Sequence, residues 1–182
     1  MKKPKSGLLY GFIVMLFLTI LGFSACSKKS GEATGGDGEK FLTCKLNGQY
    51  YEFNYRVNAN DKPATDTVHF VVIGGWEKQD MIKGFGIDLT LPEGAKETTY
   101  VAAGTTAISL HGKYYIQNMK DGKIVGTMGY NGGTSAGTNF TLTITSLTKW
   151  GVKGTFSGKL KLVGGGDEYV TVTEGKFSAP YN

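Results

Sequence analysis

One serine in this chain has the sequence context of a catalytic nucleophile. Ser135 lies in Gly133-Thr-Ser-Ala-Gly137, which fits the Gly-x-Ser-x-Gly pattern. That pattern works because a strained turn from a strand into a helix exposes the hydroxyl and aims backbone amides at an oxyanion. Here small polar residues precede the serine and an alternating, threonine-rich strand pattern follows it, so the helix is missing. The sequence therefore predicts that Ser135 is not a nucleophile and that the chain is not an enzyme.

Other groups that could carry acid–base or metal chemistry are few and scattered. His69 and His111 are the only histidines, and neither lies in a spacing typical of zinc ligands. We expect no cofactor and no metal site. Two carboxylates from separate loops can still form the pair that glycoside hydrolysis needs, because their separation in space decides that chemistry. A hydrolase that acts on glycans therefore remains an alternative. The candidates for its pair of carboxylates are Glu77, Asp80, Asp88 and Glu174.

Two tryptophans give the one positive indication of a ligand. Trp76 follows Gly74-Gly75 and Trp150 precedes Gly151, so both rings fall at the ends of predicted strands. An exposed indole flanked by polar groups can stack on the face of a sugar. The alternative is that each ring covers an open end of the hydrophobic core. Trp76 and Trp150 are therefore the candidate ligand-contact residues.

The N-terminus has the three parts of a secretory signal peptide. Three lysines in the first five residues precede an uncharged apolar stretch over residues 8–21, and the small pair Ser24-Ala25 comes just before Cys26. This arrangement resembles the lipobox of bacterial lipoproteins, with Phe23 in place of the more common leucine. The resemblance implies that residues 1–25 are removed and that Cys26 carries the lipid. An uncleaved transmembrane helix and a plain secretory signal are the alternatives.

Residues 27–39 contain no large apolar side chain, so they cannot bury enough surface to offset the entropy of ordering. We expect the lipidated cysteine and a flexible tether to span residues 26–39. We expect the chain to be lipid-anchored in the cell envelope, in the outer membrane of a Gram-negative bacterium. Lys28 and Lys29 make the start of the tether basic, and because it lacks an acidic export signal, the periplasmic side is slightly favoured over the cell surface.

The rest of the chain, residues 40–182, is predicted to form a single β domain. Three of the 20 basic residues of the chain lie in the signal peptide, which leaves 17 against 15 acidic residues. Such a balanced charge gives no argument for binding nucleic acid. Cys44 alternates with Leu42 and Leu46, the pattern of a small buried hydrophobe, whereas a reactive or metal-binding thiol is the alternative. No disulfide is available within this domain.

Apolar and polar residues alternate with a period of two from residue 41 onward, and helical periodicity is nearly absent. Asn47-Gly48 predicts a type I′ hairpin turn, and Asp121-Gly122 is a second hairpin signal. Gly74-Gly75 is expected to end a strand, residues 131–139 to form a mobile connection, and Glu174-Gly175 to form a bulge or turn. The predicted strands cover residues 41–46, 49–55, 67–73, 83–91, 98–102, 106–110, 113–117, 123–130, 140–145, 152–162, 169–173 and 176–178.

About ten short strands, each with one apolar face, predict an all-β protein with an antiparallel β-sandwich. A closed, lipocalin-like barrel is the alternative.

Segments at the two ends of this domain carry a further resemblance. Lys45-Leu-Asn-Gly-Gln-Tyr-Tyr51 resembles the N-terminal Asn-Gly hairpin of a family of small Gram-negative lipoproteins of unknown function. Residues 141–147, 152–160 and 170–178 are similar to the C-terminal meander of that family, with its Gly-Thr-Phe-Ser-Gly segment. The resemblance implies a β fold and a lipid anchor, and it brings no catalytic residues.

These observations together predict a membrane-anchored, non-enzymatic module that binds a partner or interacts with the cell envelope. The expected partners are the membrane, through the lipid on Cys26, and a glycan or an envelope protein. Two alternatives stay open besides this one. They are the glycan-acting hydrolase and a lipocalin-like carrier of a small apolar ligand.

Overall fold

The computed structural model of the chain describes residues 39–60, 67–103 and 108–182. The predicted signal peptide, the lipidation site Cys26 and residues 27–38 of the predicted tether lie outside these ranges. Within the described ranges no helix is long and apolar enough to span a membrane. The strands are β1 (Phe41–Leu46), β2 (Gln49–Glu52), β3 (Tyr55–Asn58), β4 (Phe70–Trp76), β5 (Lys83–Thr90), β6 (Thr99–Ala102), β7 (Ser109–Lys120), β8 (Lys123–Gly133), β9 (Phe140–Thr148), β10 (Gly151–Leu162) and β11 (Tyr169–Pro180), with one 3-10 turn, η1 (Thr134–Ala136).

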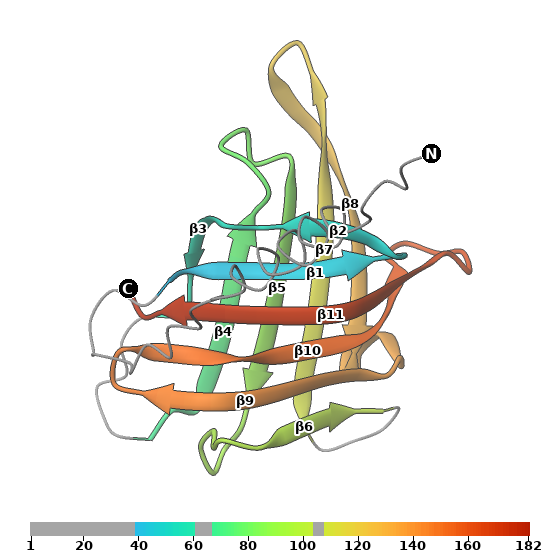
Figure 1. Cartoon of the computed structure of the whole chain (residues 1–182). Coiled ribbons are helices and arrows are strands. Elements are labelled where there is room, and N and C mark those ends of the chain that lie inside the picture. Colours follow the sequence, from blue (N-terminus) through green and yellow to red (C-terminus); the bar gives the residue numbers. More distant parts are fainter. Residues whose placement is uncertain (1–38, 61–66, 104–107) are drawn as a thin grey trace, which may run out of the picture. The chain divides into compact units, whose positions relative to one another are not determined.

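The strands form one continuous antiparallel sheet that folds into two facing layers. Its hydrogen-bonded order is β2-β1-β11-β10-β8-β7-β5-β4-β3, with β9 paired to β10 and β6 paired to β9. We call β2-β1-β11-β10-β9-β6 the first layer and β8-β7-β5-β4-β3 the second layer. Strand β10 joins them, because most of it pairs with β9 while its last residues pair with β8. Figure 1 shows the strands of one layer crossing those of the other at a steep angle.

This arrangement confirms the predicted all-β, antiparallel, sandwich-like fold. The described part of the sheet is open and does not close into a barrel, since its end strands β2 and β3 are joined by the chain and not by a ladder of hydrogen bonds.

Aromatic rings fill the space between the layers. The ring of Phe156 lies 5.1 Å from that of Phe85, 6.3 Å from that of Phe140 and 6.4 Å from that of Phe177, measured between centroids. Phe53 packs on Phe85 at 5.6 Å. All five side chains are buried. These contacting rings form a densely packed core between the layers.

Several local predictions are confirmed. Asn47 and Gly48 have φ angles of 49° and 84°, and Asp121 and Gly122 have φ angles of 50° and 72°. Positive values at both central residues are those of a type I′ turn. Cys44 is fully buried on the inner side of β1, as a small hydrophobe, and burial raises the pKa of its thiol to about 12.

The predicted strand over residues 49–55 is in fact two strands, because the chain changes layers there. β2 pairs with β1 in the first layer, whereas β3 pairs with β4 in the second. At the corner, the amide of Phe53 donates to the carbonyl of Leu42 at 2.7 Å. The side-chain oxygen of Asn54 accepts from the amide of Leu42 at 3.0 Å, so the break in the ladder leaves these groups satisfied.

Two glycine positions that were expected to interrupt strands lie inside them. Strand β4 runs through Gly74-Gly75 to Trp76. A Cβ atom at Gly75 would lie 2.1 Å from the carbonyl oxygen of Phe53, so glycine permits a close approach of two backbones and does not end the strand. Likewise β7 continues through Gly112, where the ring of Phe140 occupies the space of a side chain.

The predicted mobile connection over residues 131–139 is also corrected. Its first residues, up to Gly133, belong to β8, and η1 follows directly. The hydroxyl of Thr134 donates to the carbonyl of Ile108 at 2.6 Å, and that of Thr138 donates to the carbonyl of Lys159 at 2.5 Å. These bonds tie the small polar residues of the connection to the neighbouring strands.

Candidate ligand-binding site

The outer face of the first layer carries rows of hydroxyl side chains. On β9, Phe140, Leu142 and Ile144 point inward, so the threonines between them point outward. The ladder pairs Thr143 with Thr99 on one side and with Thr155 on the other, and the next row pairs Thr141 with Ser157. The hydroxyl oxygens of Thr99 and Thr143 are 2.9 Å apart. Because threonine is stiff at χ1, the sheet holds these hydroxyls at fixed positions.

A bulge in β11 interrupts the rows. The register of β11 shifts by one residue against both β10 and β1 at Glu174, which has a φ angle of 53°. This confirms the bulge predicted at Glu174-Gly175. The extra residue sends its carboxylate onto the outer face, where Oε1 of Glu174 accepts a hydrogen bond from Nζ of Lys45 at 2.7 Å.

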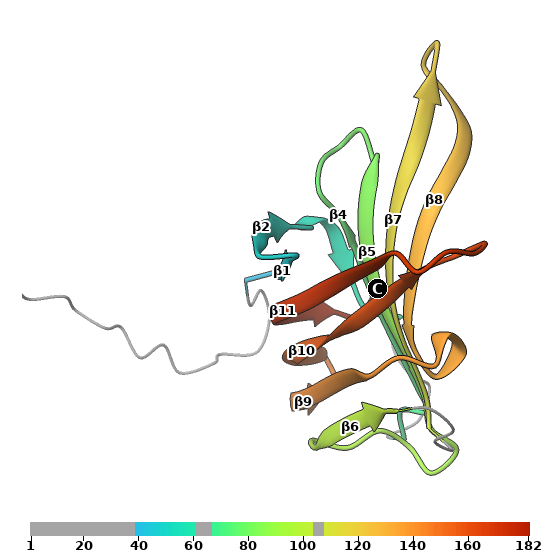
Figure 2. The same ribbon diagram turned by 90° about the vertical axis from the view of Figure 1, so that its right-hand side faces the viewer.

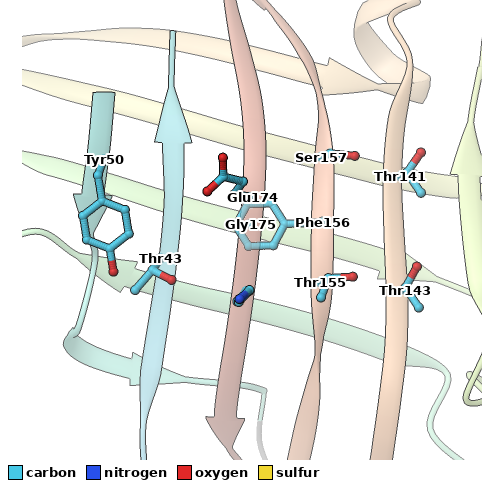
Figure 3. Close-up of a pocket in the computed structure, with 10 residues that line it drawn as sticks. Thr43, Tyr50, Thr141, Thr143, Thr155, Phe156, Ser157, Glu174 and Gly175 are labelled. Carbon is cyan, nitrogen blue, oxygen red and sulfur yellow. The ribbon is translucent and has the colours of Figure 1, made fainter. Parts of the chain in front are cut away.

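Around the bulge the face is hollowed. The hollow has a volume of about 440 Å³ and is open to solvent. Figure 3 shows Tyr50 and Thr43 on one side of Glu174, and Thr155, Ser157, Thr141 and Thr143 on the other. Five strands supply the side chains that line it: Thr43, Tyr50, Thr141, Thr143, Thr155, Phe156, Ser157, Glu174, Gly175 and Lys176.

Tyr50 is the aromatic residue at the rim of this hollow. Its side chain is 56% exposed, and its hydroxyl donates to Oε1 of Glu52 at 3.3 Å. The Asn47-Gly48 turn places Tyr50 directly opposite Lys45, next to the ion pair with Glu174. The site therefore combines one exposed ring, several hydroxyls, the carboxylate of Glu174 and the ammonium groups of Lys45 and Lys176 on one sheet.

The lining contains a single carboxylate, that of Glu174. Glycoside hydrolysis needs a second carboxyl group within about 5–10 Å on the other side of the scissile bond. The other carboxylates considered above have local partners: Asp88 pairs with Lys113, Glu77 lies 3.7 Å from Lys83, and Asp80 accepts from the amide of Ile82. In the described ranges no group of three or more His, Cys, Asp or Glu side chains is placed to hold a metal ion.

The structure brings Ser135 next to His111, a contact that sequence reasoning missed because the two residues are 24 positions apart. Oγ of Ser135 lies 3.0 Å from Nδ1 of His111, and Nε2 lies 3.1 Å from Oγ of Ser109. Two of the nearby amides already have partners within the protein. That of Ser135 donates to Nδ1 at 3.4 Å, and that of Gly133 donates to the hydroxyl of Thr138 at 3.1 Å. These two amides are therefore not directed at an oxyanion.

The two tryptophans do not line the hollow. Trp76, the last residue of β4, packs edge-on against Tyr115 with 5.0 Å between ring centroids. Trp150 lies in the turn between β9 and β10, is 56% exposed and has Nζ of Lys149 5.0 Å from its ring centroid. They belong to different layers. Of the two, Trp150 has the exposed ring that a ligand contact would need.

Sequence reasoning did not single out Tyr50, although two signals in the chain point to it. The Asn47-Gly48 turn sets its register against Lys45, and the Glu174-Gly175 break marks the bulge beside it. What the sequence lacks is the order of the strands.

Comparison of the chain with protein-family models, with characterised proteins and with solved structures finds no match.

Proposed function

We propose that this protein is a membrane-anchored, non-enzymatic module of the cell envelope that binds a hydroxyl-rich polysaccharide in the hollow of its first layer. The observation that carries this proposal is the bulge at Glu174, which places a charged group between the exposed ring of Tyr50 and two rows of hydroxyls.

The chemistry of the lining supports a polysaccharide over a protein partner. Each Thr or Ser hydroxyl can both donate and accept a hydrogen bond, as each hydroxyl of a sugar can. Protein–protein interfaces instead have apolar, aromatic centres and are depleted in serine. The hollow is also open to solvent, whereas sites for small molecules enclose most of the ligand surface. A chain lying across several strands fits this shape.

The backbone at Glu174 adds a second argument. A non-glycine residue with a φ angle of 53° in the middle of a strand costs on the order of 1 kcal/mol or more. Strand β11 has neighbours on both sides, so the bulge disturbs two ladders at once. Such strain is typical of positions that serve binding.

The anchoring part of the proposal is supported by the signal-like N-terminus, by Cys26 and by the following segment, which has no large apolar side chain. Together with the resemblance to small Gram-negative lipoproteins, they favour the outer membrane, with the domain on the periplasmic side. The two alternative functions have less support. A carrier needs the interior that aromatic rings fill. A hydrolase needs a carboxylate opposite Glu174, and the carboxylate of Glu52 beside the hollow accepts a hydrogen bond from Tyr50.

Titration of the purified protein with envelope polysaccharides tests the binding function. We expect Tyr50→Ala to weaken binding at least about tenfold, the loss typical of an aromatic residue that dominates an interface. Thr143→Val should weaken it less. Thr145→Val is the matched control, since Thr145 is exposed two residues along the same strand but does not line the hollow.

The proposal is wrong if no envelope polysaccharide binds, or if binding survives both Tyr50→Ala and Thr143→Val. Turnover of the glycan that Glu174→Gln abolishes would instead favour the hydrolase.

A further inference from the structure

The β7–β8 hairpin extends beyond the rest of the domain, as both ribbon views show (Figures 1 and 2). The ladder between β5 and β7 ends at Ile116, and the ladder between β10 and β8 ends at Tyr130. Gln117 and Gly129 still form backbone hydrogen bonds to Ile82 and Val163. Beyond them the two strands pair only with each other, around the turn at Asp121-Gly122. We call residues 118–127 the hairpin tip.

The hairpin tip exposes three large apolar side chains. Met119, Ile124 and Val125 are 43%, 56% and 62% exposed, and they are three of the nine large apolar or aromatic residues exposed in the described ranges. Met119 lies directly opposite Ile124, while Val125 is the extra residue of a register shift. A two-stranded ribbon is marginally stable in water, and apolar groups left exposed on it do not stabilise it.

The charges of the hairpin tip have one predominant sign. Lys120 lies directly opposite Lys123, a pairing of like charges that destabilises a ladder. Asp121, between them, is the one acidic residue of the tip, so the net charge is positive. Within the described part of the chain neither lysine forms an ion pair. An anionic surface outside the domain would relieve their repulsion.

We infer that the hairpin tip docks on the anionic surface of a lipid bilayer. The apolar side chains would enter the boundary between headgroups and acyl chains, and the two ammonium groups would lie at the level of the phosphates. Apolar side chains flanked by lysines at a protruding turn match these two adjacent zones of a membrane. The inference rests on the membrane-anchored part of the proposed function.

Because the lipid anchor would already hold the domain near the membrane, a weak contact between the hairpin tip and the bilayer is sufficient for docking. The tether that the sequence predicts over the 13 residues between Cys26 and the domain would have a root-mean-square reach of about 20 Å. Tethering at that distance turns docking of the tip into an intramolecular step at high effective concentration. The anchor and the hairpin tip would then form two attachment points, which fix the orientation of the domain and hence of the hollow above the membrane.

Fluorescence from the hairpin tip tests this inference. The mature chain, residues 26–182 with Cys26→Ser and Val125→Cys, is labelled with an environment-sensitive dye, while the buried Cys44 stays unlabelled. An N-terminal histidine tag on a nickel-chelating lipid supplies the anchor, so the result does not depend on lipidation. The control carries the dye at Lys153→Cys, an exposed position on β10.

On vesicles containing phosphatidylglycerol, the dye at position 125 should shift to the blue and be quenched several-fold more by a lipid-borne quencher than the dye at position 153. Lys120→Gln with Lys123→Gln should remove the preference over phosphatidylcholine vesicles, and Met119→Ser with Ile124→Ser should remove the quenching. Equal quenching of the dyes at positions 125 and 153 overturns the inference. So does a result in which an envelope protein, and no vesicle, shifts the emission of the dye at position 125. Flotation of the unmodified chain with its own membranes tests the anchor separately.

Discussion

The ring of Phe156 lies where a side chain at Gly175 would have to be. A Cβ atom at position 175 would lie 2.6 Å from Cδ2 of Phe156 and 2.4 Å from its carbonyl oxygen. The two residues are also paired across the β10–β11 ladder, next to the bulge. Gly175 therefore lets a core ring pack directly beneath the strained residue Glu174, which links the hydrophobic core to the hollow on the outer face.

Gly175→Ala should destabilise the domain by about 1–3 kcal/mol, because the added methyl group overpacks the contact with Phe156. Gly74→Ala is the control: a Cβ atom there would be 3.9 Å from its nearest neighbour, so stability should change little. Urea unfolding of both variants measures the difference. Equal stability of the two variants would mean that the backbone at Gly175 moves away without loss.

Phe156→Ala should cost about 3–5 kcal/mol of unfolding free energy, because it leaves a cavity among three rings. Phe70→Ala provides the comparison, since Phe70 is 58% exposed and its loss should cost less than about 1 kcal/mol. Chemical denaturation monitored by circular dichroism gives both values. A cost below about 1 kcal/mol for Phe156→Ala would place the core elsewhere.

Glu174→Gly should abolish or strongly weaken polysaccharide binding while leaving stability within about 1 kcal/mol of wild type. Glycine relieves the positive φ angle but loses more entropy on folding, and the exposed ion pair with Lys45 contributes little. Calorimetric titration and thermal unfolding measure the two effects. Unchanged affinity in a stable variant would remove Glu174 from the binding site.

Cys44 should make the folded protein less stable at alkaline pH. Its pKa is about 12 in the folded state against 9.0 for an ordinary thiol, so the folded state holds the proton more tightly. The stabilising contribution is complete below pH 9 and is lost as the pH rises from 9 towards 12, by about 1 kcal/mol between pH 9 and 10. Urea unfolding of wild type and Cys44→Ala as a function of pH isolates this contribution. Parallel curves for the two proteins would contradict it.

Cys26→Ala should leave the protein as an unprocessed precursor or release it from the membrane fraction, because the thiol is the proposed attachment point of the lipid. Metabolic labelling with a radioactive fatty acid, followed by fractionation, measures the effect. The matched control is Cys44→Ala, which should retain label and location. Normal processing and labelling of Cys26→Ala would refute the anchor.

The features that depend on neighbouring residues could be predicted from the sequence. Alternation of apolar and polar residues set the bounds of β1, and the positive φ angles of Asn47-Gly48 and Asp121-Gly122 follow from their residue types. The burial of Cys44 and the bulge at Glu174-Gly175 were predicted for the same reason. Backbone conformation and strand period act over a few residues, and a single sequence contains that information in full.

Features that depend on distant segments were decided by the tertiary structure. A glycine pair can end a strand or admit another backbone, and at Gly75 only the carbonyl of Phe53 distinguishes the two. His111 meets Ser135, and Tyr50 meets the hydroxyls of β9 and β10 across a hollow, because of the order in which the strands pair. Strand order reflects which apolar faces pack together over the whole core. No local pattern specifies that choice, and the candidate binding site therefore emerged only when five strands were placed side by side.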